Sequence, residues 1–359
     1  MSERLILVED DPEGMRAALI VDSRLHVLEI DNALRPTQVG RIARARGVRG
    51  LRNVGPVAIL EDGTEWLLDG RKGYGGDTPV MQIARDARGG KLGHASRAVA
   101  LTGPSLVHQP FGQGVSFSRR LDDDTERRGR IETILLDREG GWIVRRTAPL
   151  AQPEDLSAEI VALAEEGERL VREGTMSPPD AFRRLVADHG LPAPAKIVTS
   201  GRKSEATVKG WCRLFAPSWT ARCERYTAPP SLFDFYDLDT VIATLGESRV
   251  AFAEGGWLAI ERTEALTAID VNAGAADPMS ANLAAAAEIG RQLRLRHIGG
   301  IVVIDFVSLG RKADCERVEN ALRKALADDA AKSHILPMSP LGLIEMTREQ
   351  RGPVLEIGV

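Results

Sequence analysis

The chain has 359 residues, which is long enough for two or three domains that each bury a core of their own. Its hydrophobic fraction of 43% and charged fraction of 27% indicate a globular protein. The sequence shows no apolar run long enough to span a membrane, and the segment 1–13 is too charged for a signal peptide, so we expect a cytoplasmic location. The formal charge of -4 argues against a protein that simply coats nucleic acid, and three scattered cysteines exclude a disulfide framework and a CxxC zinc site.

The N-terminal region reads as short strands. Leu5 to Val8, Ala17 to Val21 and Leu25 to Ile30 are apolar runs joined by turns, which predicts an antiparallel meander. Short strands punctuated by glycine continue from about residue 40 to residue 96, for example Val57 to Leu60 and Trp66 to Leu68. A small closed barrel is the natural arrangement for such strands.

An arginine-rich stretch lies at the start of this barrel region. No acidic residue occurs between Asn32 and Leu60, and the same segment carries Arg35, Arg41, Arg44, Arg46, Arg49 and Arg52. Such a block forms either a solvated basic face or a surface that contacts nucleic-acid phosphates, and both interpretations stay open.

Helices follow in the middle of the chain. Apolar residues recur at helical spacing from Leu156 to Val171, which predicts a helix with one buried face. The sequence Ser-Pro-Pro-Asp predicts a second helix, with Ser177 as its N-cap and proline at the first helical position, ending near His189.

The last region carries the candidate chemistry. Trp257 to Ile260 and Ala265 to Val271 are expected to pair as strands, and a helix follows that we expect Gly299 and Gly300 to stop. The continuous apolar run Ile301 to Ile304 predicts a strand covered on both faces. Strand, helix and strand together have the size of a βαβ unit with parallel strands.

Two aspartates then fall toward the carboxyl ends of these strands. Asp270 ends one strand and Asp305 the other, and Asn272 shares a face with Asp270 because it is two residues away. Two unit charges ~4 Å apart repel by about 4 kcal/mol at an effective dielectric of ~20, and a divalent cation removes the conflict. Oxygen ligands favour Mg²⁺ or Mn²⁺. The alternative is that each aspartate caps a helix or fixes a turn.

Four ordered segments resemble the ribonuclease E/G family: EALTAIDVNAG at 264–274, EIGRQLRLR at 288–296, GGIVVIDF at 299–306 and GLIEMTR at 342–348. The resemblance implies a Mg²⁺-dependent endoribonuclease that cleaves single-stranded RNA by metal-activated water attack and leaves 5′-phosphate ends, in RNA processing or decay. Asp270 and Asp305 would hold the metal, and Asn272 would support catalysis. The alternative is a non-catalytic RNA-binding protein, or a structural partner in an RNA-decay assembly, derived from this family.

The resemblance also implies a multidomain α/β architecture. Residues 1–34 and 192–245 would form a discontinuous RNase-H-like domain, and residues 35–95 a reduced, inserted OB-like RNA-binding barrel. Residues 96–191 would form a 5′-sensor-like region, and residues 246–359 a DNase-I-like catalytic domain.

Further roles follow from the same resemblance. RNA contacts are expected from Lys91 and from the barrel residues Arg41, Arg44, Arg46 and Trp66, the one aromatic residue between Asp31 and Gly73. A pocket for the 5′ monophosphate is expected at Arg146, Thr147 and Lys332, with Arg145 as an alternative to Arg146. Lysine in place of the family's arginine keeps the charge and loses the bidentate fork, which predicts a weakened 5′ preference.

The sequence as printed departs from the family in one more respect. It contains no CPxCxG-type segment, so we expect no zinc and no zinc-bridged dimer. A homodimer through the catalytic domain remains an expectation from the resemblance.

Overall fold

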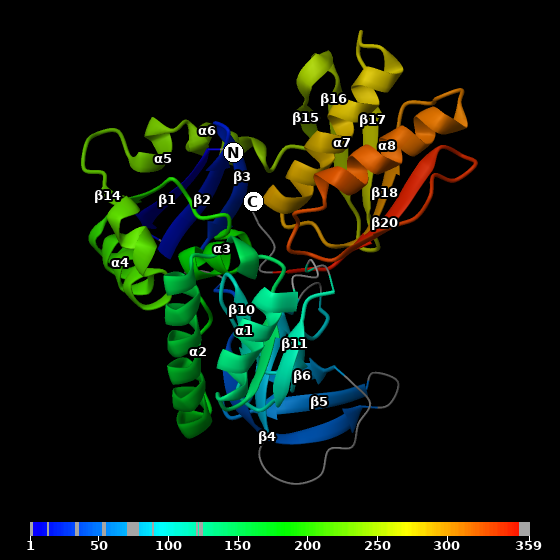
Figure 1. Cartoon of the computed structure of the whole chain (residues 1–359). Coiled ribbons are helices and arrows are strands. Elements are labelled where there is room, and N and C mark those ends of the chain that lie inside the picture. The colour runs from blue at the N-terminus through cyan, green and yellow to red at the C-terminus, as the bar shows by residue number, and fades with distance from the viewer. Residues whose placement is uncertain are drawn as a thin grey trace. The chain divides into compact units, whose positions relative to one another are not determined.

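The computed structural model describes residues 3–12, 14–32, 36–51, 55–69, 79–87, 90–119, 121 and 125–351. Contacts between residues divide the chain into two compact units, Met1–Leu232 and Phe233–Val359. Figure 1 colours them from the blue N-terminal strands to the red C-terminal strand. Within the described residues, no helix combines the length and the apolar character needed to cross a lipid bilayer.

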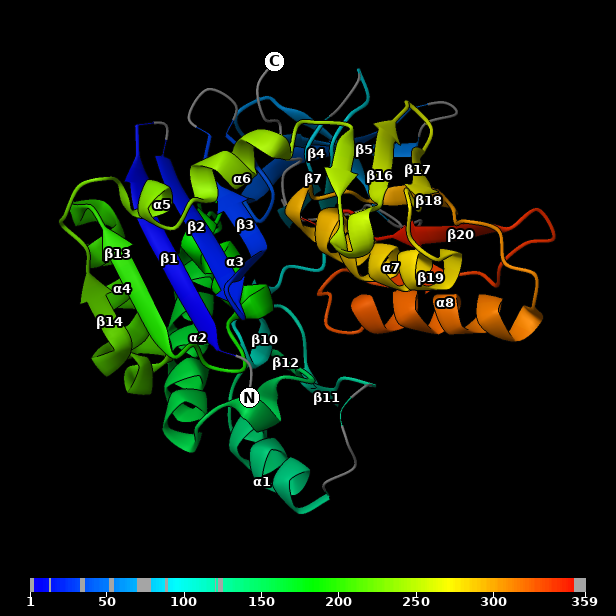
Figure 2. The same ribbon diagram turned by 90° about the horizontal axis from the view of Figure 1, so that it is seen from above.

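The first unit contains a five-stranded sheet in the order β14-β13-β1-β2-β3. Its strands are β1 (Arg4–Asp11), β2 (Gly14–Val21), β3 (Arg24–Ile30), β13 (Lys196–Ser200) and β14 (Cys223–Arg225). The first three strands pair antiparallel, which confirms the predicted meander, whereas β13 and β14 add in parallel. Helix α3 (Ala181–His189) packs on β2 and β3, and α4 (Arg202–Phe215) packs on β1 and β13 (Figure 2).

The predicted small barrel is confirmed. Five strands close it in the order β4-β5-β6-β8-β7, namely β4 (Ile42–Leu51), β5 (Gly55–Leu60), β6 (Glu65–Leu68), β7 (Val80–Arg85) and β8 (His94–Ser96). The pairing of β6 with β8 is parallel, and the other pairings are antiparallel. Trp66 and smaller apolar side chains fill the interior because inward-facing residues alternate with outward ones along each strand.

A four-stranded sheet completes the first unit, in the order β11-β12-β10-β9. Its strands are β9 (Leu101–Thr102), β10 (Leu106–Gln109), β11 (Gly114–Phe117) and β12 (Gly141–Val144). Helix α2 (Pro153–Glu173) contacts β9 and β10, which confirms the predicted helix, and α1 (Thr125–Leu136) contacts β11. Two short 3-10 helices, η1 (Ala148–Leu150) and η2 (Pro217–Arg222), link these elements.

The predicted start of the second helix is wrong. Helix α3 begins at Ala181, and its N-cap is Asp180, whose carboxylate accepts a hydrogen bond from the Arg183 backbone nitrogen at 2.8 Å. Two consecutive prolines follow Ser177, and proline disfavours helical geometry in the residue before it. The cap therefore falls on the first hydrogen-bonding side chain after the prolines.

The second unit is built on a six-stranded sheet in the order β15-β16-β17-β18-β20-β19. Its strands are β15 (Arg249–Ala251), β16 (Trp257–Arg262), β17 (Thr267–Asn272), β18 (Gly300–Asp305), β19 (Ser333–Ile335) and β20 (Leu343–Arg348). Helices α7 (Pro278–Leu295) and α8 (Lys312–Ala325) lie together along one side of the sheet (Figure 2). Strands β17 and β18 flank α7 and pair in parallel, so the predicted βαβ unit is confirmed. Two shorter helices precede this sheet, α5 (Leu232–Phe235) and α6 (Leu238–Thr244), and the 3-10 helix η3 (Ala253–Gly255) lies between β15 and β16.

Among the described residues of the second unit, helices cover one face of this sheet, so the prediction that the strand at Ile301 to Ile304 is covered on both faces is wrong. Val302 and Ile304 are fully buried in the core, whereas Ile301, the residue before Val302, is 50% exposed. We call the uncovered side, with Asp270 and Asp305 on it, the open face.

The predicted stop of helix α7 at the glycine pair is also wrong. The helix ends at Leu295, and His297 takes a positive φ of 49°. Arg296 already lies outside helical geometry, so the chain turns before it reaches Gly299, and Gly300 instead starts β18.

Candidate active site

Asp270 and Asp305 lie side by side on the open face. They are register partners on the parallel strands β17 and β18. Their neighbours Ile269 and Ile304 are also register partners and are buried in the core, so both aspartates point the other way. Adjacent strands lie ~4.8 Å apart, which brings two acidic side chains from distant parts of the sequence to one place.

Asn272 supports this pair. It lies two residues beyond Asp270 on the same face, and its Nδ2 atom donates a hydrogen bond of 2.6 Å to Oδ2 of Asp270. The bond fixes the orientation of the carboxylate and leaves Oδ1 available for another partner. Ala259 is the register partner of Asp270 on the other side, so a methyl group adjoins the site there.

Neither aspartate caps the helix that follows its strand. The side chain that caps α7 is Asp277, which accepts a hydrogen bond from the Ser280 nitrogen at 2.9 Å, and the N-cap position of α8 is Arg311. Neither Asp270 nor Asp305 is therefore needed to begin the helix that follows its strand.

The donor set of this site fits a hard divalent cation. Two carboxylates and a neighbouring amide offer oxygen ligands, and Mg²⁺ commonly takes one or two protein carboxylates while water or substrate phosphate fills its other positions. Among the residues that the structure describes, no group of three or more His, Cys, Asp or Glu side chains could hold a metal ion. A cation here would therefore depend on the two aspartates.

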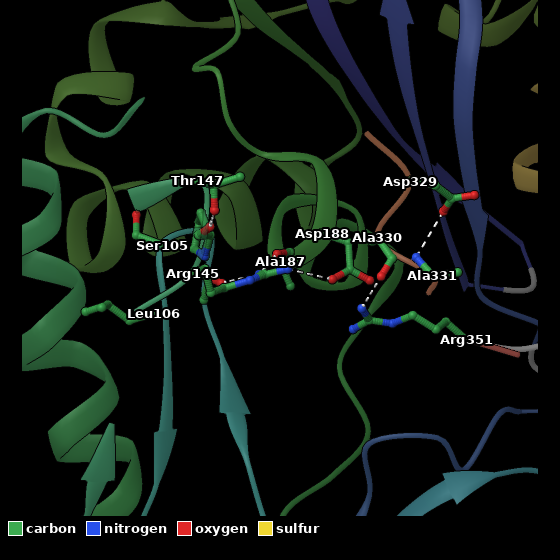
Figure 3. Close-up of polar contacts among 12 residues, drawn as sticks. Ser105, Leu106, Arg145, Thr147, Ala187, Asp188, Asp329, Ala330, Ala331 and Arg351 are labelled. Carbon is green, nitrogen blue, oxygen red and sulfur yellow. Dashed lines mark hydrogen bonds and ion pairs between the residues drawn. The ribbon is translucent and has the colours of Figure 1, made fainter. Parts of the chain in front are cut away.

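A second polar cluster surrounds the residues expected in the 5′-phosphate pocket (Figure 3). The guanidinium of Arg145 donates to the Gly103 carbonyl at 2.6 Å, to the Ala187 carbonyl, and to Oδ1 of Asp188 at 3.1 Å. Arg145 thus ties the turn before β10 to the end of α3. These contacts use the side chain within the fold and favour Arg146 over Arg145 for the pocket.

Thr147 belongs to the same cluster. Its Oγ1 donates a hydrogen bond of 2.6 Å to the Pro104 carbonyl, and Arg146 beside it is partly exposed. Lys332 lies in the second unit, where it is exposed and its carbonyl accepts from the Glu349 backbone nitrogen at 2.8 Å. Arg146 and Thr147 are consecutive residues, so these two members of the expected pocket lie next to each other.

Buried Glu159 on α2 holds the turn to which Arg145 and Thr147 are bonded. Its Oε1 accepts hydrogen bonds of 2.9 Å from the Ser105 and Leu106 nitrogens. Complete burial raises the pKa of Glu159 to about 7, although these hydrogen bonds and the Arg145 charge oppose the rise. This turn therefore depends on a carboxyl group that titrates near neutral pH.

The barrel arginines that are expected to contact RNA differ in how far their side chains are already engaged within the protein. Arg41 pairs with Asp62 at 2.6 Å, and the Arg44 guanidinium is within 3.5 Å of the Arg172 carbonyl. Burial raises the pKa of Asp62, but hydrogen bonds from Thr64 and Arg41 outweigh it and lower the pKa to about 2. Of the same arginine-rich stretch, Arg49 donates from Nη2 to both carboxylate oxygens of Glu65, while Arg35 and Arg52 lie outside the described residues.

Arg46 and Lys91 are exposed. The structure shows no hydrogen bond or ion pair between the Arg46 side chain and the described residues. Arg46 therefore keeps its positive charge available for phosphate contacts.

The position of Trp66 does not fit the RNA contact expected of it. Its side chain is 7% exposed in the barrel core, and its Nε1 donates to Thr64 Oγ1 at 2.9 Å. The ring fills the barrel because β6 alternates inward and outward residues, and Trp66 falls on an inward position.

Arg249 and Trp257 are not among the residues that the sequence marks as functional, yet they lie on the open face. The guanidinium carbon of Arg249 is 4.0 Å from the centroid of the Trp257 ring. Trp257 is the register partner of Asn272. The only available signal in the sequence is the two-residue alternation of the strand that begins at Trp257.

Comparisons with known proteins agree with these features. A model of the Ribonuclease E/G family matches residues 100–351, which include Asp270, Asn272 and Asp305. Ribonuclease G of Salmonella typhimurium is 30% identical over 295 residues, covering 77% of this chain and 60% of that protein. Ribonuclease E of Haemophilus influenzae is 27% identical over 395 aligned residues, covering 98% of this chain and 42% of that protein. The chain thus spans less than two thirds of the length of these relatives.

Proposed function

Because the chain belongs to the ribonuclease E/G family, we propose that it is a Mg²⁺-dependent endoribonuclease that cleaves single-stranded RNA and leaves 5′-phosphate ends. The observation that carries this proposal is the register pairing of Asp270 with Asp305 on the open face. Burying or separating these carboxylates would have argued for an RNA-binding protein without catalysis.

Each residue of the site has a proposed role. Asp270 and Asp305 hold the divalent ion, and Asn272 orients Asp270 through its 2.6 Å hydrogen bond. A bound Mg²⁺ supplies Lewis-acid polarisation of a phosphodiester and activation of water for in-line displacement. The open face leaves the RNA backbone access to the carboxylates.

The architecture supports the finer domain assignments. Three antiparallel strands followed by two parallel ones, all between Arg4 and Arg225, support the RNase-H-like domain proposed for 1–34 and 192–245, although contacts between residues assign 233–245 to the second unit. The closed barrel at β4 to β8 supports an OB-like RNA-binding domain at 35–95, and the six-stranded sheet with its two helices supports a DNase-I-like catalytic domain at 246–359. Residues 96–191 would then form the 5′ sensor.

RNA would be held outside the catalytic pair by two groups of residues. Arg46 and Lys91 would contact phosphates, since both are exposed cations of the barrel region. Arg146 and Thr147 would bind a 5′ monophosphate. The Thr147 hydroxyl, which donates to the Pro104 carbonyl, would have to rotate to donate to the phosphate.

The proposal is tested with purified protein and a 5′-monophosphorylated single-stranded RNA of defined sequence. Fragments that form with Mg²⁺, disappear with EDTA, and carry a ligatable 5′ phosphate support the proposal. RNA that is bound and left intact under all metal conditions would instead support the non-catalytic alternative.

A further inference from the structure

The open face carries an arginine stacked on a tryptophan beside the aspartate pair. Val250 and Leu258 are register partners that pack on the core, so Arg249 and Trp257, one residue before each, face the open side. The guanidinium of Arg249 lies 4.0 Å from the Trp257 ring centroid. We call these two side chains the Arg–Trp shelf.

The shelf lies close to the proposed metal ligands. Trp257 is the register partner of Asn272, and Arg249 shares a row across the sheet with Ala259 and Asp270. Two strand spacings amount to roughly 10 Å, which is within reach of two neighbouring nucleotides. The side chain between Arg249 and Asp270 in this row is the methyl group of Ala259, so no large side chain separates them.

The Trp257 ring is also held by the loop that follows β17. A Cβ atom added to Gly274 would lie 3.6 Å from Cζ3 of Trp257, so the loop backbone adjoins the ring. Gly274 itself adopts a φ of 61°, a conformation that favours glycine. The shelf is therefore anchored to the same strand and loop that carry Asp270 and Asn272.

The exposure of the shelf points to a ligand. Trp66, Trp142, Trp211 and Trp219 are each 7% exposed or less, whereas Trp257 is only partly buried. Arg249 is exposed and makes no hydrogen bond or ion pair with the side chains that the structure describes. Its five donors are thus available to groups outside the chain.

We propose that the Arg–Trp shelf binds one nucleobase of the RNA next to the phosphate that is cleaved, an inference that rests on the proposed nuclease function. Bases of single-stranded RNA stack on aromatic rings and on arginine guanidinium planes. The base stacks on the exposed side of the shelf, and the guanidinium edge donates to the adjoining phosphate. The shelf holds the RNA strand next to Asp270 and Asp305.

The first test combines protein variants with RNA that lacks single bases. Trp257→Ala and Arg249→Ala are compared with the conservative Trp257→Phe and Arg249→Lys, and with Arg317→Ala, an exposed arginine of α8, as the control. We expect Trp257→Ala to raise KM by about 10-fold with kcat nearly unchanged, and Trp257→Phe to restore most of the loss. Arg317→Ala should match the wild type.

Coupling then identifies the stacked base. An abasic nucleotide at one position near the cleavage site should cost the wild type about 10-fold in KM and cost Trp257→Ala nothing further. Equal, additive losses in the wild type and Trp257→Ala at every position tested would overturn the shelf as a base-binding site.

A fluorescence measurement separates the shelf from the nuclease function. Adding RNA to an Asp305→Asn protein should quench the tryptophan emission. The quenching should disappear in the double variant that also carries Trp257→Phe. Quenching without any cleavage by the wild-type protein would support the shelf and refute the proposed nuclease. Cleavage with quenching that persists in Trp257→Phe would refute the shelf alone.

Discussion

The amide nitrogen of Asn272 lies 2.6 Å from Oδ2 of Asp270, on the strand next to the one that carries Asp305. Parallel pairing of β17 and β18 places the two carboxylates in register, and the buried isoleucines beside them fix the face to which they point. The geometry of the site is therefore set by the sheet itself.

Replacing Asn272 with alanine should reduce cleavage because Asp270 loses the bond that orients it. Outer-shell partners of metal ligands typically contribute 10- to 100-fold in metal affinity or activity. We expect Asn272→Ala to raise the Mg²⁺ concentration needed for half-maximal activity by about 10-fold. Glu261→Gln, on the same face of β16, is the control and should leave this concentration unchanged; an equal shift in both variants would argue against the orienting role.

Much of this second unit can be predicted from the sequence. The apolar strand ending on Asp270, the helix after it and the second strand ending on Asp305 predict a βαβ unit, and short connections in such units leave few alternatives. The two-residue spacing of Asp270 and Asn272 likewise predicts their shared face. Local periodicity was sufficient there because both strands are adjacent in the sheet.

The two consecutive arginines of the middle region should behave differently. Arg146→Ala should reduce the preference for 5′-monophosphorylated over 5′-hydroxyl RNA by about 10-fold, because a charge-assisted contact is lost. Competition between the two RNAs in one reaction measures this preference. An unchanged ratio would remove Arg146 from the pocket.

Arg145→Ala should instead lower stability. It would leave the Gly103 and Ala187 carbonyls and Asp188 without their common donor, at a cost of about 2–4 kcal/mol in the free energy of unfolding. Urea denaturation of both arginine variants compares them directly. A fully stable Arg145→Ala protein with no 5′ preference would reverse the two assignments.

Arg46→Ala should weaken RNA binding in a salt-dependent manner. Each phosphate neutralised on a single strand contributes about 0.7 to the slope of log K against log salt concentration, so the slope should become shallower by about that amount. Arg46→Lys, which keeps the charge, is the matched control. Identical slopes for the wild type and Arg46→Ala would show that this arginine makes no phosphate contact.

Glu159 should make stability depend on pH. Its pKa is raised from 4.5 to about 7 in the folded protein, so as pH rises from 4.5 to 7 the unfolded chain releases this proton first. The stabilisation that Glu159 provides below pH 4.5 is then lost as the pH rises. The free energy of unfolding should fall by about 3 kcal/mol once the pH exceeds 7. Glu159→Gln, which keeps an oxygen acceptor for Ser105 and Leu106, should lack this component.

Denaturation of the wild type, Glu159→Gln and the exposed helix control Glu168→Gln at pH 5 and pH 7.5 tests this prediction. The difference between the two pH values should shrink in Glu159→Gln and stay unchanged in Glu168→Gln. The same difference in all three proteins would show that Glu159 titrates at its ordinary pKa.

Other features depend on tertiary structure that the local pattern does not contain. A partly buried tryptophan on a sheet face and a barrel-filling tryptophan have the same periodicity, so the roles of Trp66 and Trp257 could be distinguished only after the strands were paired. Ile301 likewise belongs to a continuous apolar run, yet the helices that cover the described part of the sheet, α7 and α8, lie on the other face. The Arg249 contact with Trp257 joins two strands and leaves no motif in the chain.

The most direct measurement is the cleavage rate of Asp270→Asn and Asp305→Asn proteins as a function of Mg²⁺ concentration, with circular dichroism to establish that they fold. Both positions are exposed, so the fold should persist, while the loss of a direct ligand should exceed the ~100-fold expected for an outer-shell partner. We predict a rate reduced by more than ~100-fold in each variant and only slightly further in the double variant. Near wild-type cleavage by either folded variant would contradict joint coordination of a metal ion by the two carboxylates.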